Sequence, residues 1–434
     1  MILRLARALL TVLLYALGVI ALFLSSLEDP ARGALSLSLL ALQLLRIVLL
    51  GRSDSLTISL SVAAIFLFAL PGAGVVVLLG IDILLPILVF ILFFDVLRIA
   101  AKRDRRQTIL PMRADLSRKA HSQYRALLAV ILVWCAVAGF LIDSEGFVGL
   151  LLFVAPYAAA LIVFERCLAA RASFAFSAIG AAGFLLTLAI YVTFHWSGFG
   201  RLVIGAFALG PLLVINHHRD LGIRTAAIAL VAPLALYFAQ LSRYGRIDDP
   251  EEFLIGSAGH HFIVSNDIVG MNLYRYFGGF DVFFSQYTLM FANWVPRSVW
   301  EDKPVGAGLW SVDAVYGRQG YGEGYSQSLG FVGELYLYLG PDFWIGGIIA
   351  LVMLILLRRL VAQFSFGYVA PLVLFDINLV SYLWGGFATF GSRVWFMVVP
   401  AMILAWWLRR AYLRRLQRRK VRVGTGAATV QVPV

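Results

Sequence analysis

The sequence has few charged residues and almost no cysteine. Only 14% of its 434 residues are Asp, Glu, Lys or Arg, whereas a soluble globular chain has about 25%. Cys135 and Cys167 are too few for a disulfide framework and have no zinc-ligand spacing. We therefore interpret both as small buried or interfacial side chains. The shortage of charge excludes an ordinary soluble domain.

Several catalytic signatures are also missing. There is no Walker loop, no His-Glu-x-x-His and no Gly-x-Ser-x-Gly. ATP-driven transport and zinc proteolysis therefore lose support, and we predict no metal and no cofactor. The net charge of +12 resembles that of a nucleic-acid-binding protein, but the positions of the basic residues explain it without a nucleic-acid partner.

Long apolar runs dominate the rest of the chain. Hydrophobic residues make up 61% of the sequence, and runs of 17–25 of them suit a bilayer core of about 30 Å. The sequence predicts an all-α polytopic membrane protein. Its first apolar run, Met1–Leu24, lacks a clear cleavage site, so we expect a retained helix. About twelve spans are predicted: 5–24, 34–50, 56–79, 82–99, 126–142, 147–164, 174–194, 201–215, 225–241, 331–357, 368–384 and 393–408. The third is interrupted by Pro71-Gly72 and is either one kinked helix or part of a re-entrant hairpin.

Basic residues give this topology an orientation. With both ends on the same side, that side holds 27 of the 36 Lys and Arg residues and the other side holds 9. The positive-inside rule then places both termini in the cytoplasm. The predicted organisation is a nine-span bundle (1–241), an outer loop segment (242–330), three last spans (331–408) and a basic tail (409–434). We expect the tail and the basic loop 102–125 to meet anionic lipid headgroups.

The outer segment, residues 242–330, differs from the rest in composition. It holds ten acidic and six basic residues together with many aromatic ones. Residues 268–295 are aromatic and amphipathic but too polar to span, so we expect helices that lie at the outer membrane interface.

Two sequence blocks in this region carry a family resemblance. Residues 293–306 read Asn-Trp-Val-Pro-Arg-Ser-Val-Trp-Glu-Asp-Lys-Pro-Val-Gly, and residues 317–340 contain Ser-x-Ser-x-Gly-x-x-Gly-Glu-x-Tyr-x-x-x-Gly. Together with Arg393 at the mouth of the last span, they resemble the O-antigen (Wzy-type) polymerases of oligosaccharide repeat units. The specific part of the resemblance is 275–340, whereas the first nine spans match only in number and hydropathy.

The resemblance implies a glycosyltransferase on the outer face of the bacterial inner membrane. Such an enzyme moves a growing glycan from its polyprenyl pyrophosphate carrier to the next lipid-linked repeat unit. The implied partners are the polyprenyl-pyrophosphate-linked oligosaccharide, the bilayer, a chain-length regulator and a flippase.

The leaving pyrophosphate needs cations near the lipid surface, and an arginine fork matches phosphate oxygens. Arg275, Arg297, Lys303 and Arg393 are the candidates. Each also has an ordinary interpretation as an interfacial cation that reaches headgroups or pairs with a local acid.

The acceptor hydroxyl would be helped by a general base. Glu334 is the leading candidate, because an acid in a membrane span calls for a reason. It either acts as the base or holds one of the arginines. His260 and His261 are further candidates, although a surface pair in a glycine-rich turn explains them more simply. Asp281 is a lesser one.

Aromatic and hydroxyl side chains in the same blocks suit a glycan groove. Aromatic faces stack on sugar rings, and the interfacial aromatic belt of membrane proteins is the competing explanation. The predicted substrate-binding residues of this kind are Trp300, Tyr325, Ser326, Ser328 and Tyr336.

Three alternatives stay open. One is an O-antigen ligase and another is a different carrier-lipid-dependent glycosyltransferase. The third is a lipid-linked oligosaccharide flippase or other transporter, which would use a central pathway. Asp376, in the middle of a span, would favour the transporter, whereas an outer cavity lined by Arg275, Arg297 and Arg393 would favour glycosyl transfer.

Overall fold

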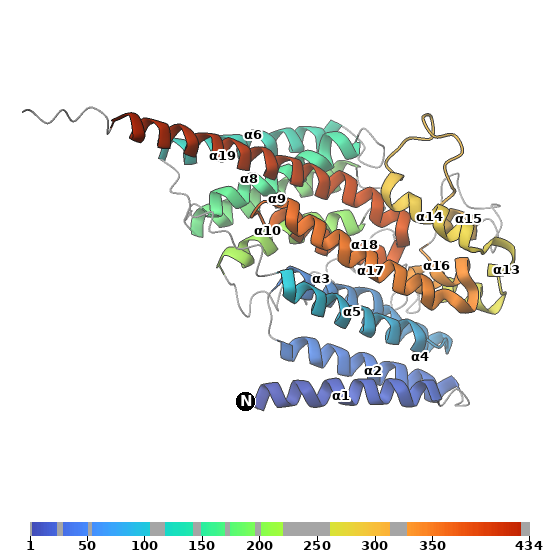
Figure 1. Ribbon diagram of the computed structural model, residues 1–434. Helices are drawn as coiled ribbons and strands as arrows, with labels where there is room; N and C mark the ends of the chain where they lie inside the picture. The colour runs from blue at the N-terminus through green and yellow to red at the C-terminus, as the bar shows by residue number, and fades with distance from the viewer. Residues whose placement is uncertain are drawn as a thin grey trace, which may run out of the picture.

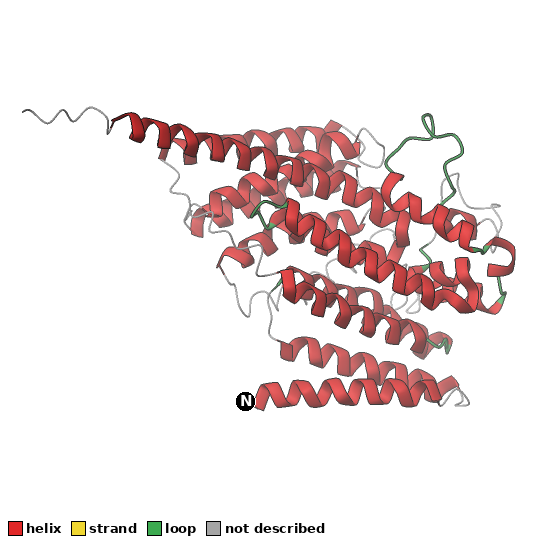
Figure 2. Ribbon diagram, viewed as in Figure 1, coloured by secondary structure: helices red, strands yellow, loops and turns green. Residues whose placement is uncertain are grey.

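A computed structural model describes most of the chain. The described residues are 2–23, 29–50, 54–104, 118–141, 149–169, 174–195, 201–219, 261–312 and 328–426. Within these ranges every regular element is a helix, as Figure 2 shows. The all-α prediction is therefore confirmed for this part of the chain.

The helices lie roughly along one common direction and form a broad bundle (Figure 1). The N-terminal end of α1 and the C-terminal end of α19 lie at the same end of the bundle, on the left of that view. The elements are α1 (Ile2–Phe23), α2 (Asp29–Leu50), α3 (Ser55–Ala63), η1 (Ala64–Ala69), α4 (Leu70–Leu79), α5 (Leu84–Asp104), α6 (Arg118–Leu141), η2 (Leu150–Val154), α8 (Ala155–Ala169), α9 (Phe174–His195), α10 (Arg201–Arg219), α13 (Tyr274–Phe277), α14 (Phe280–Ala292), α15 (Ala307–Ser311), α16 (Gly330–Leu339), η5 (Gly340–Asp342), α17 (Phe343–Phe364), α18 (Ala370–Arg393), η6 (Val394–Val398) and α19 (Val399–Gly426).

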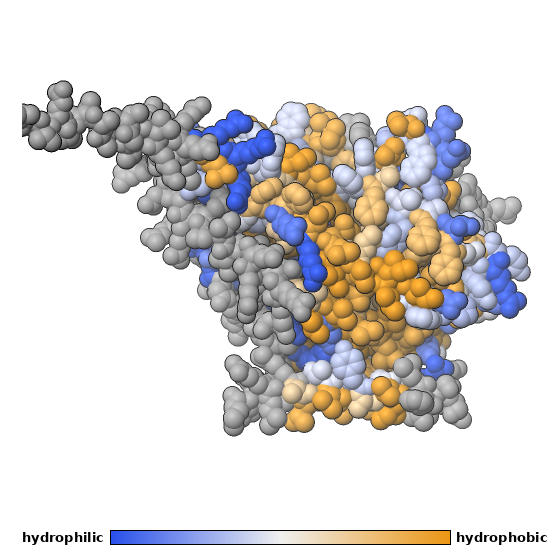
Figure 3. Space-filling model, in the orientation of Figure 1, coloured by the Kyte–Doolittle hydropathy of each residue, from blue (hydrophilic) through white to orange (hydrophobic). Residues whose placement is uncertain are grey.

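Seven stretches of the described chain are long and apolar enough to cross a membrane, as expected of a helical membrane protein. In the space-filling view, apolar side chains gather in the middle of the visible face and hydrophilic ones lie toward its two ends (Figure 3). The predicted span 225–241 lies outside the described residues.

The third predicted span is one continuous helix. Residues Ser55–Leu79 form a single apolar stretch that passes from α3 through η1 into α4. The π-helical turns of η1 end just before Pro71, which lies in the first turn of α4. Because a proline lacks the N–H that a continuing α-helix would use, the wide turn lets the helix pass without a break. The re-entrant alternative is not observed.

The predicted span 331–357 is wrong as a single helix. It consists of α16 and α17, which are joined by the short turn η5 at Gly340–Asp342. A Cβ at Gly346 would touch Leu335 and Leu339, whereas a straight helix would separate residues 335 and 346 by about 16 Å. Helix α16 therefore folds back along α17. Its ten residues are too few to cross a bilayer, which leaves its first turn inside the bundle.

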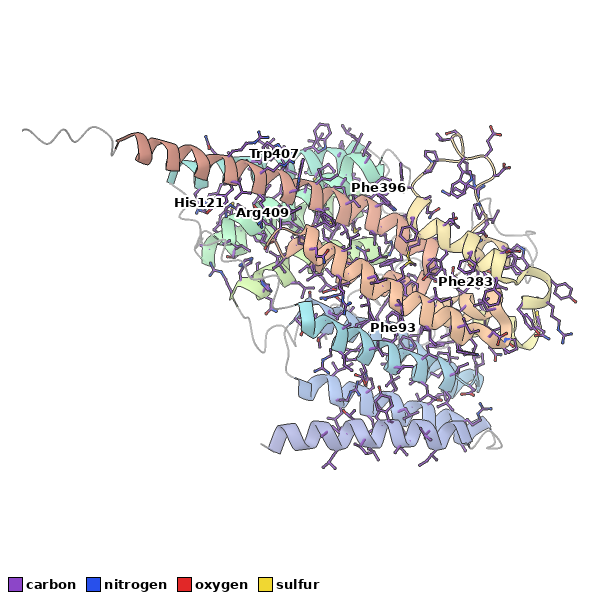
Figure 4. All side chains as sticks on the ribbon, in the orientation of Figure 1. Phe93, His121, Phe283, Phe396, Trp407 and Arg409 are labelled. Atoms are coloured by element: carbon purple, nitrogen blue, oxygen red, sulfur yellow. The ribbon has the colours of Figure 1, made fainter. Side chains whose placement is uncertain are left out.

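Aromatic contacts show where the first turn of α16 lies along the length of the bundle. Phe331 packs on Phe93 at a centroid distance of 5.8 Å, and Phe93 lies at the middle of the apolar stretch Leu84–Ala101. Figure 4 labels Phe93 and, nearer the right-hand end of the bundle, Phe283 of α14. Residues 261–265 share this interior position, because His261 packs on Phe68 at 6.1 Å. Part of the predicted outer segment thus lies between the helices.

The long apolar stretch Ala370–Arg414 is a hairpin of two helices. Its backbone leaves the helical region at Gly386, and residues on either side of that point meet in pairs. Asn378 donates to the sulfur of Met397 at 3.2 Å, and Arg393 donates to Ser381. The predicted spans 368–384 and 393–408 are the two arms of this hairpin. Helix α14 packs against α18 beside the turn.

Candidate active site at the break in α18

The break at Gly386 requires a glycine. Its φ of 67° and ψ of −158° belong to a backbone region that is essentially open to glycine alone. A Cβ at this position would also overlap the carboxylate of Glu334. The turn therefore brings the backbone of α18 against α16 more closely than any other residue would allow.

The carboxylate of Glu334, which belongs to α16, lies against the first residue of the second arm of the hairpin. Its carboxylate accepts a hydrogen bond from the backbone N–H of Phe387 at 3.1 Å and one from the Tyr338 hydroxyl at 2.8 Å. The side chain is only 4% exposed. A helix that restarts inside the bundle leaves its first N–H groups unpaired, and a carboxylate is the favoured acceptor at that positive end. Glu334 thus caps the N-terminus of the second arm as an N-cap residue would, although it comes from another helix.

Two further side chains stabilise the broken backbone. Ser328, two residues before the first residue of α16, donates its hydroxyl to the carbonyl of Trp384. Asn293, at the end of α14, donates from its amide to the carbonyl of Ala388 at 2.9 Å. Both sequence blocks therefore converge on the same five residues of α18, although they are about 50 to 95 positions away along the chain.

Arg393 lies on the second arm, two turns beyond the break. Its guanidinium donates to the Ser381 hydroxyl of the first arm, and its side chain is partly exposed. Among the described residues no acidic group pairs with it. A cation inside an apolar bundle without an anionic partner is unfavourable. Arg393 is therefore a cation that could receive an anionic ligand beside the break.

Arg297 and Lys303 donate to backbone carbonyls of the loop between α14 and α15. Arg297 donates to the carbonyls of Lys303 at 2.8 Å and Pro304 at 3.3 Å. The ammonium of Lys303 donates to the carbonyls of Asn293 at 2.6 Å and Val295 at 3.0 Å, just after α14 ends. Burial, and next the Arg297 charge, lower the pKa of Lys303. These cations hold the loop that carries Asn293 to the break.

The other predicted site residues are distributed over the same end of the bundle. Arg275 and Asp281 are exposed on α13 and α14, and Trp300 is half-buried. Tyr336 packs edge-on against Tyr274 at 6.0 Å. His261 is buried against Gly330, whose φ of 64° lets the chain turn into α16. The hydrogen bonds of Arg297 and Arg393 go to separate segments, the loop 303–304 and Ser381 of α18. His260, Tyr325 and Ser326 lie outside the described residues.

Sequence reasoning did not assign a role to several residues at the break. Asn293 and Tyr338 lie inside the quoted blocks, so their positions were a usable signal. The glycine pair Gly385-Gly386 marks the turn only in retrospect. Ser381 and Tyr287 had no signal, because one is a serine in an apolar run and the other a tyrosine among aromatic residues.

Asp376 forms an ion pair and a hydrogen bond inside the bundle. It is fully buried and accepts from the Arg358 guanidinium at 2.8 and 3.1 Å and from the Ser55 hydroxyl at 2.6 Å. Its charge is therefore matched by a cation and its oxygens are occupied. At the start of the same arm, Glu165 accepts from the N–H groups of Val369 and Ala370 at 2.7 and 2.8 Å.

This pair leads to a stability prediction. Replacing Asp376 with Ala removes the carboxylate that accepts from the buried Arg358 guanidinium, so we expect the unfolding free energy to fall by about 3–5 kcal/mol. The double variant Asp376→Leu with Arg358→Met removes both charges and should recover most of that loss. Thermal unfolding in detergent measures both. A single Asp376→Ala variant as stable as the wild type would contradict the assignment.

Comparisons with known proteins add no identity. No family, no curated protein and no solved structure matches this chain.

Proposed function

We propose that this protein is a membrane glycosyltransferase that polymerises polyprenyl-pyrophosphate-linked oligosaccharides. The observation that carries the proposal is the convergence at the break in α18. Glu334 contacts the restarting helix, and Arg393 lies two turns further along the same arm without an acidic partner. A buried carboxylate against the start of the second arm and a cation without an acidic partner on that arm are two groups suited to glycosyl transfer from a pyrophosphate carrier.

The reaction assigns a role to each group. The bond from the anomeric carbon to the pyrophosphate oxygen breaks, and its electrons go to the pyrophosphate. The acceptor hydroxyl oxygen bonds to that carbon, and its proton passes to Glu334. Arg393 stabilises the negative charge that develops on the leaving group, which two parallel N–H donors of a guanidinium fit well.

The proposed topology has twelve spans, both termini in the cytoplasm and the break facing the outer side of a bacterial inner membrane. Two features support it. The N-terminal end of α1 and the C-terminal end of α19 lie at the same end of the bundle, opposite the end that holds α13 to α16 (Figure 1). The exposed aromatic residues of α14, among them Phe280, Phe284 and Phe291, suit a helix at the membrane interface.

The transporter alternative finds less support in these contacts. A proton or substrate pathway would be expected to use ionisable groups that change partners along the bundle. Asp376, the acid that motivated this alternative, is held by Arg358 and Ser55.

The test is deletion of the gene in the native host, followed by reconstitution. Cells without the protein should carry single repeat units and no long-chain glycan. Purified protein in liposomes, supplied with the lipid-linked oligosaccharide extracted from those cells, should form long chains with or without a chelator. Extension only onto a lipid-A core would indicate a ligase. Transbilayer movement without any new glycosidic bond would contradict the proposal in favour of a flippase.

Glu334 gives a sharper prediction. A Glu334→Gln variant keeps one oxygen, which can accept from the Phe387 N–H, and its NH2 can donate to the Tyr338 hydroxyl oxygen in place of the bond that the second carboxylate oxygen accepted. The helix break should therefore remain and thermal unfolding should change little. Without a basic carboxylate, the transfer rate should fall by about 10²- to 10⁴-fold. The reconstituted assay measures the rate. A fully active Glu334→Gln variant would leave Glu334 as a cap and remove it from the chemistry.

A further inference from the structure

Two buried polar atoms on α14 lack a partner near the break. The hydroxyl of Tyr287 is buried without a hydrogen bond, and the whole residue is 8% exposed. Its neighbour Gln286 is 3% exposed, and its Oε1 is also without a partner, although its Nε2 donates to Val305 at 2.7 Å. Because an unpaired buried polar atom is unfavourable by about 1–3 kcal/mol, such atoms call for an explanation.

The Tyr287 ring lies on the residue that begins the second arm. Its centroid is 4.5 Å from the ring of Phe387, whose N–H donates to Glu334. Tyr382 approaches the same ring from the first arm at 5.6 Å. Tyr382 is only 1% exposed. Two tyrosines and a carboxylate from three different helices thus surround Phe387.

The carboxylate has capacity for a further donor. A carboxylate has about four lone-pair positions, and Glu334 uses two of them for Phe387 and Tyr338. A tyrosine hydroxyl both donates and accepts. A neutral group that carries both a donor and an acceptor, such as an alcohol, satisfies the Tyr287 hydroxyl and the remaining lone pairs of Glu334 at once. An anion would be repelled by Glu334.

We propose that Tyr287, Tyr382 and Glu334 form a subsite for a hydroxyl group of the acceptor sugar. Tyr287 donates to the acceptor oxygen, which leaves the hydroxyl proton directed at Glu334. Tyr382 contacts the same sugar from the first arm. The inference rests on the proposed glycosyl transfer and deepens it, because it assigns the acceptor to the α14 side of the break and the pyrophosphate to the side of Arg393.

The test separates acceptor binding from donor binding. Oligosaccharide released from its carrier by mild acid lacks the pyrophosphate and can therefore accept but not donate. Its concentration is varied at a fixed concentration of lipid-linked donor, with wild type and Tyr287→Phe in liposomes. The variant keeps the ring against Phe387 and loses only the hydroxyl. We expect its KM for the released acceptor to rise about tenfold, as for the loss of one hydrogen bond, with an unchanged KM for the donor.

A matched control comes from the other end of the bundle. Tyr368, just before α18, also has a buried hydroxyl without a partner. Tyr368→Phe should leave both KM values unchanged. Loss of an unpaired hydroxyl should not lower the unfolding temperature of either variant. If Tyr287→Phe does not fold, Tyr382→Phe takes its place with the same expected rise in acceptor KM.

Failure of the subsite and failure of the function give different results. A wild-type protein that transfers no sugar contradicts the proposed function. Active wild type together with an unchanged acceptor KM in the folded variant overturns the subsite alone. An equal rise in the donor and acceptor KM values also overturns it, because the hydroxyl would then support the fold of the site as a whole.

Discussion

Replacing Arg393 with Ala should abolish long-chain product and leave the protein at least as stable as the wild type. The guanidinium is partly exposed on the second arm of the α18 hairpin, and its hydrogen-bond partner is the Ser381 hydroxyl. Removal of a preorganised donor to developing negative charge lowers a rate by about 10²- to 10³-fold. Since an isolated cation in a membrane span is unfavourable by about 2.5–3.5 kcal/mol, its loss should not destabilise the fold.

Arg358 provides the control for this prediction. It is also an arginine in an apolar helix, but it pairs with the fully buried Asp376. Arg358→Ala should therefore lower the unfolding temperature because it leaves a buried carboxylate unpaired. The opposite behaviour of the two variants separates a cation that serves a ligand from one that serves the fold.

The measurement combines glycan chain length with thermal unfolding in detergent. Arg393→Lys should retain part of the activity, because a single ammonium keeps the charge and loses the planar fork. Wild-type chain-length ladders from Arg393→Ala would refute the assignment. An Arg393→Ala variant that unfolds as easily as Arg358→Ala would show that the arginine holds the hairpin together.

The predicted spans depended on the simplest physical signal in the sequence. Helices α5, α6 and α9 follow directly from apolar length, because a span needs only about 20 residues without charge. The same signal fails at 331–357, where the turn Gly340-Pro341-Asp342 is too short to interrupt the run. Hydropathy averages over such a turn, whereas the backbone reverses there.

The candidate site was harder to predict because its contacts join distant segments. The motif identified Glu334, but its partner is an N–H that only a helix break 52 residues later makes available. Arg297 and Lys303 illustrate a second difficulty. Guanidinium and ammonium groups can donate to backbone carbonyls as well as to phosphates, so sequence alone could not foresee that they bind the backbone of their own loop.

Gly386→Ala should be the most damaging single-methyl change near the site. The new Cβ would meet two separate obstacles, an unfavourable backbone conformation and the Glu334 carboxylate. The backbone contribution alone is about 1–3 kcal/mol, and the overlap would displace the carboxylate from Phe387. We expect a marked fall in unfolding temperature together with loss of glycan transfer.

Gly80 allows the two contributions to be separated. It also has a positive φ, 66°, at the end of α4, but a Cβ there would meet no atom within 4 Å. Gly80→Ala should therefore show the backbone contribution alone, about 1–2 kcal/mol. Adding Glu334→Ala to Gly386→Ala should relieve the overlap, so the double variant should be more stable than the sum of the two single changes predicts. Strict additivity, or a Gly386→Ala variant as mild as Gly80→Ala, would mean that the close approach of α16 to the break does not hold the hairpin.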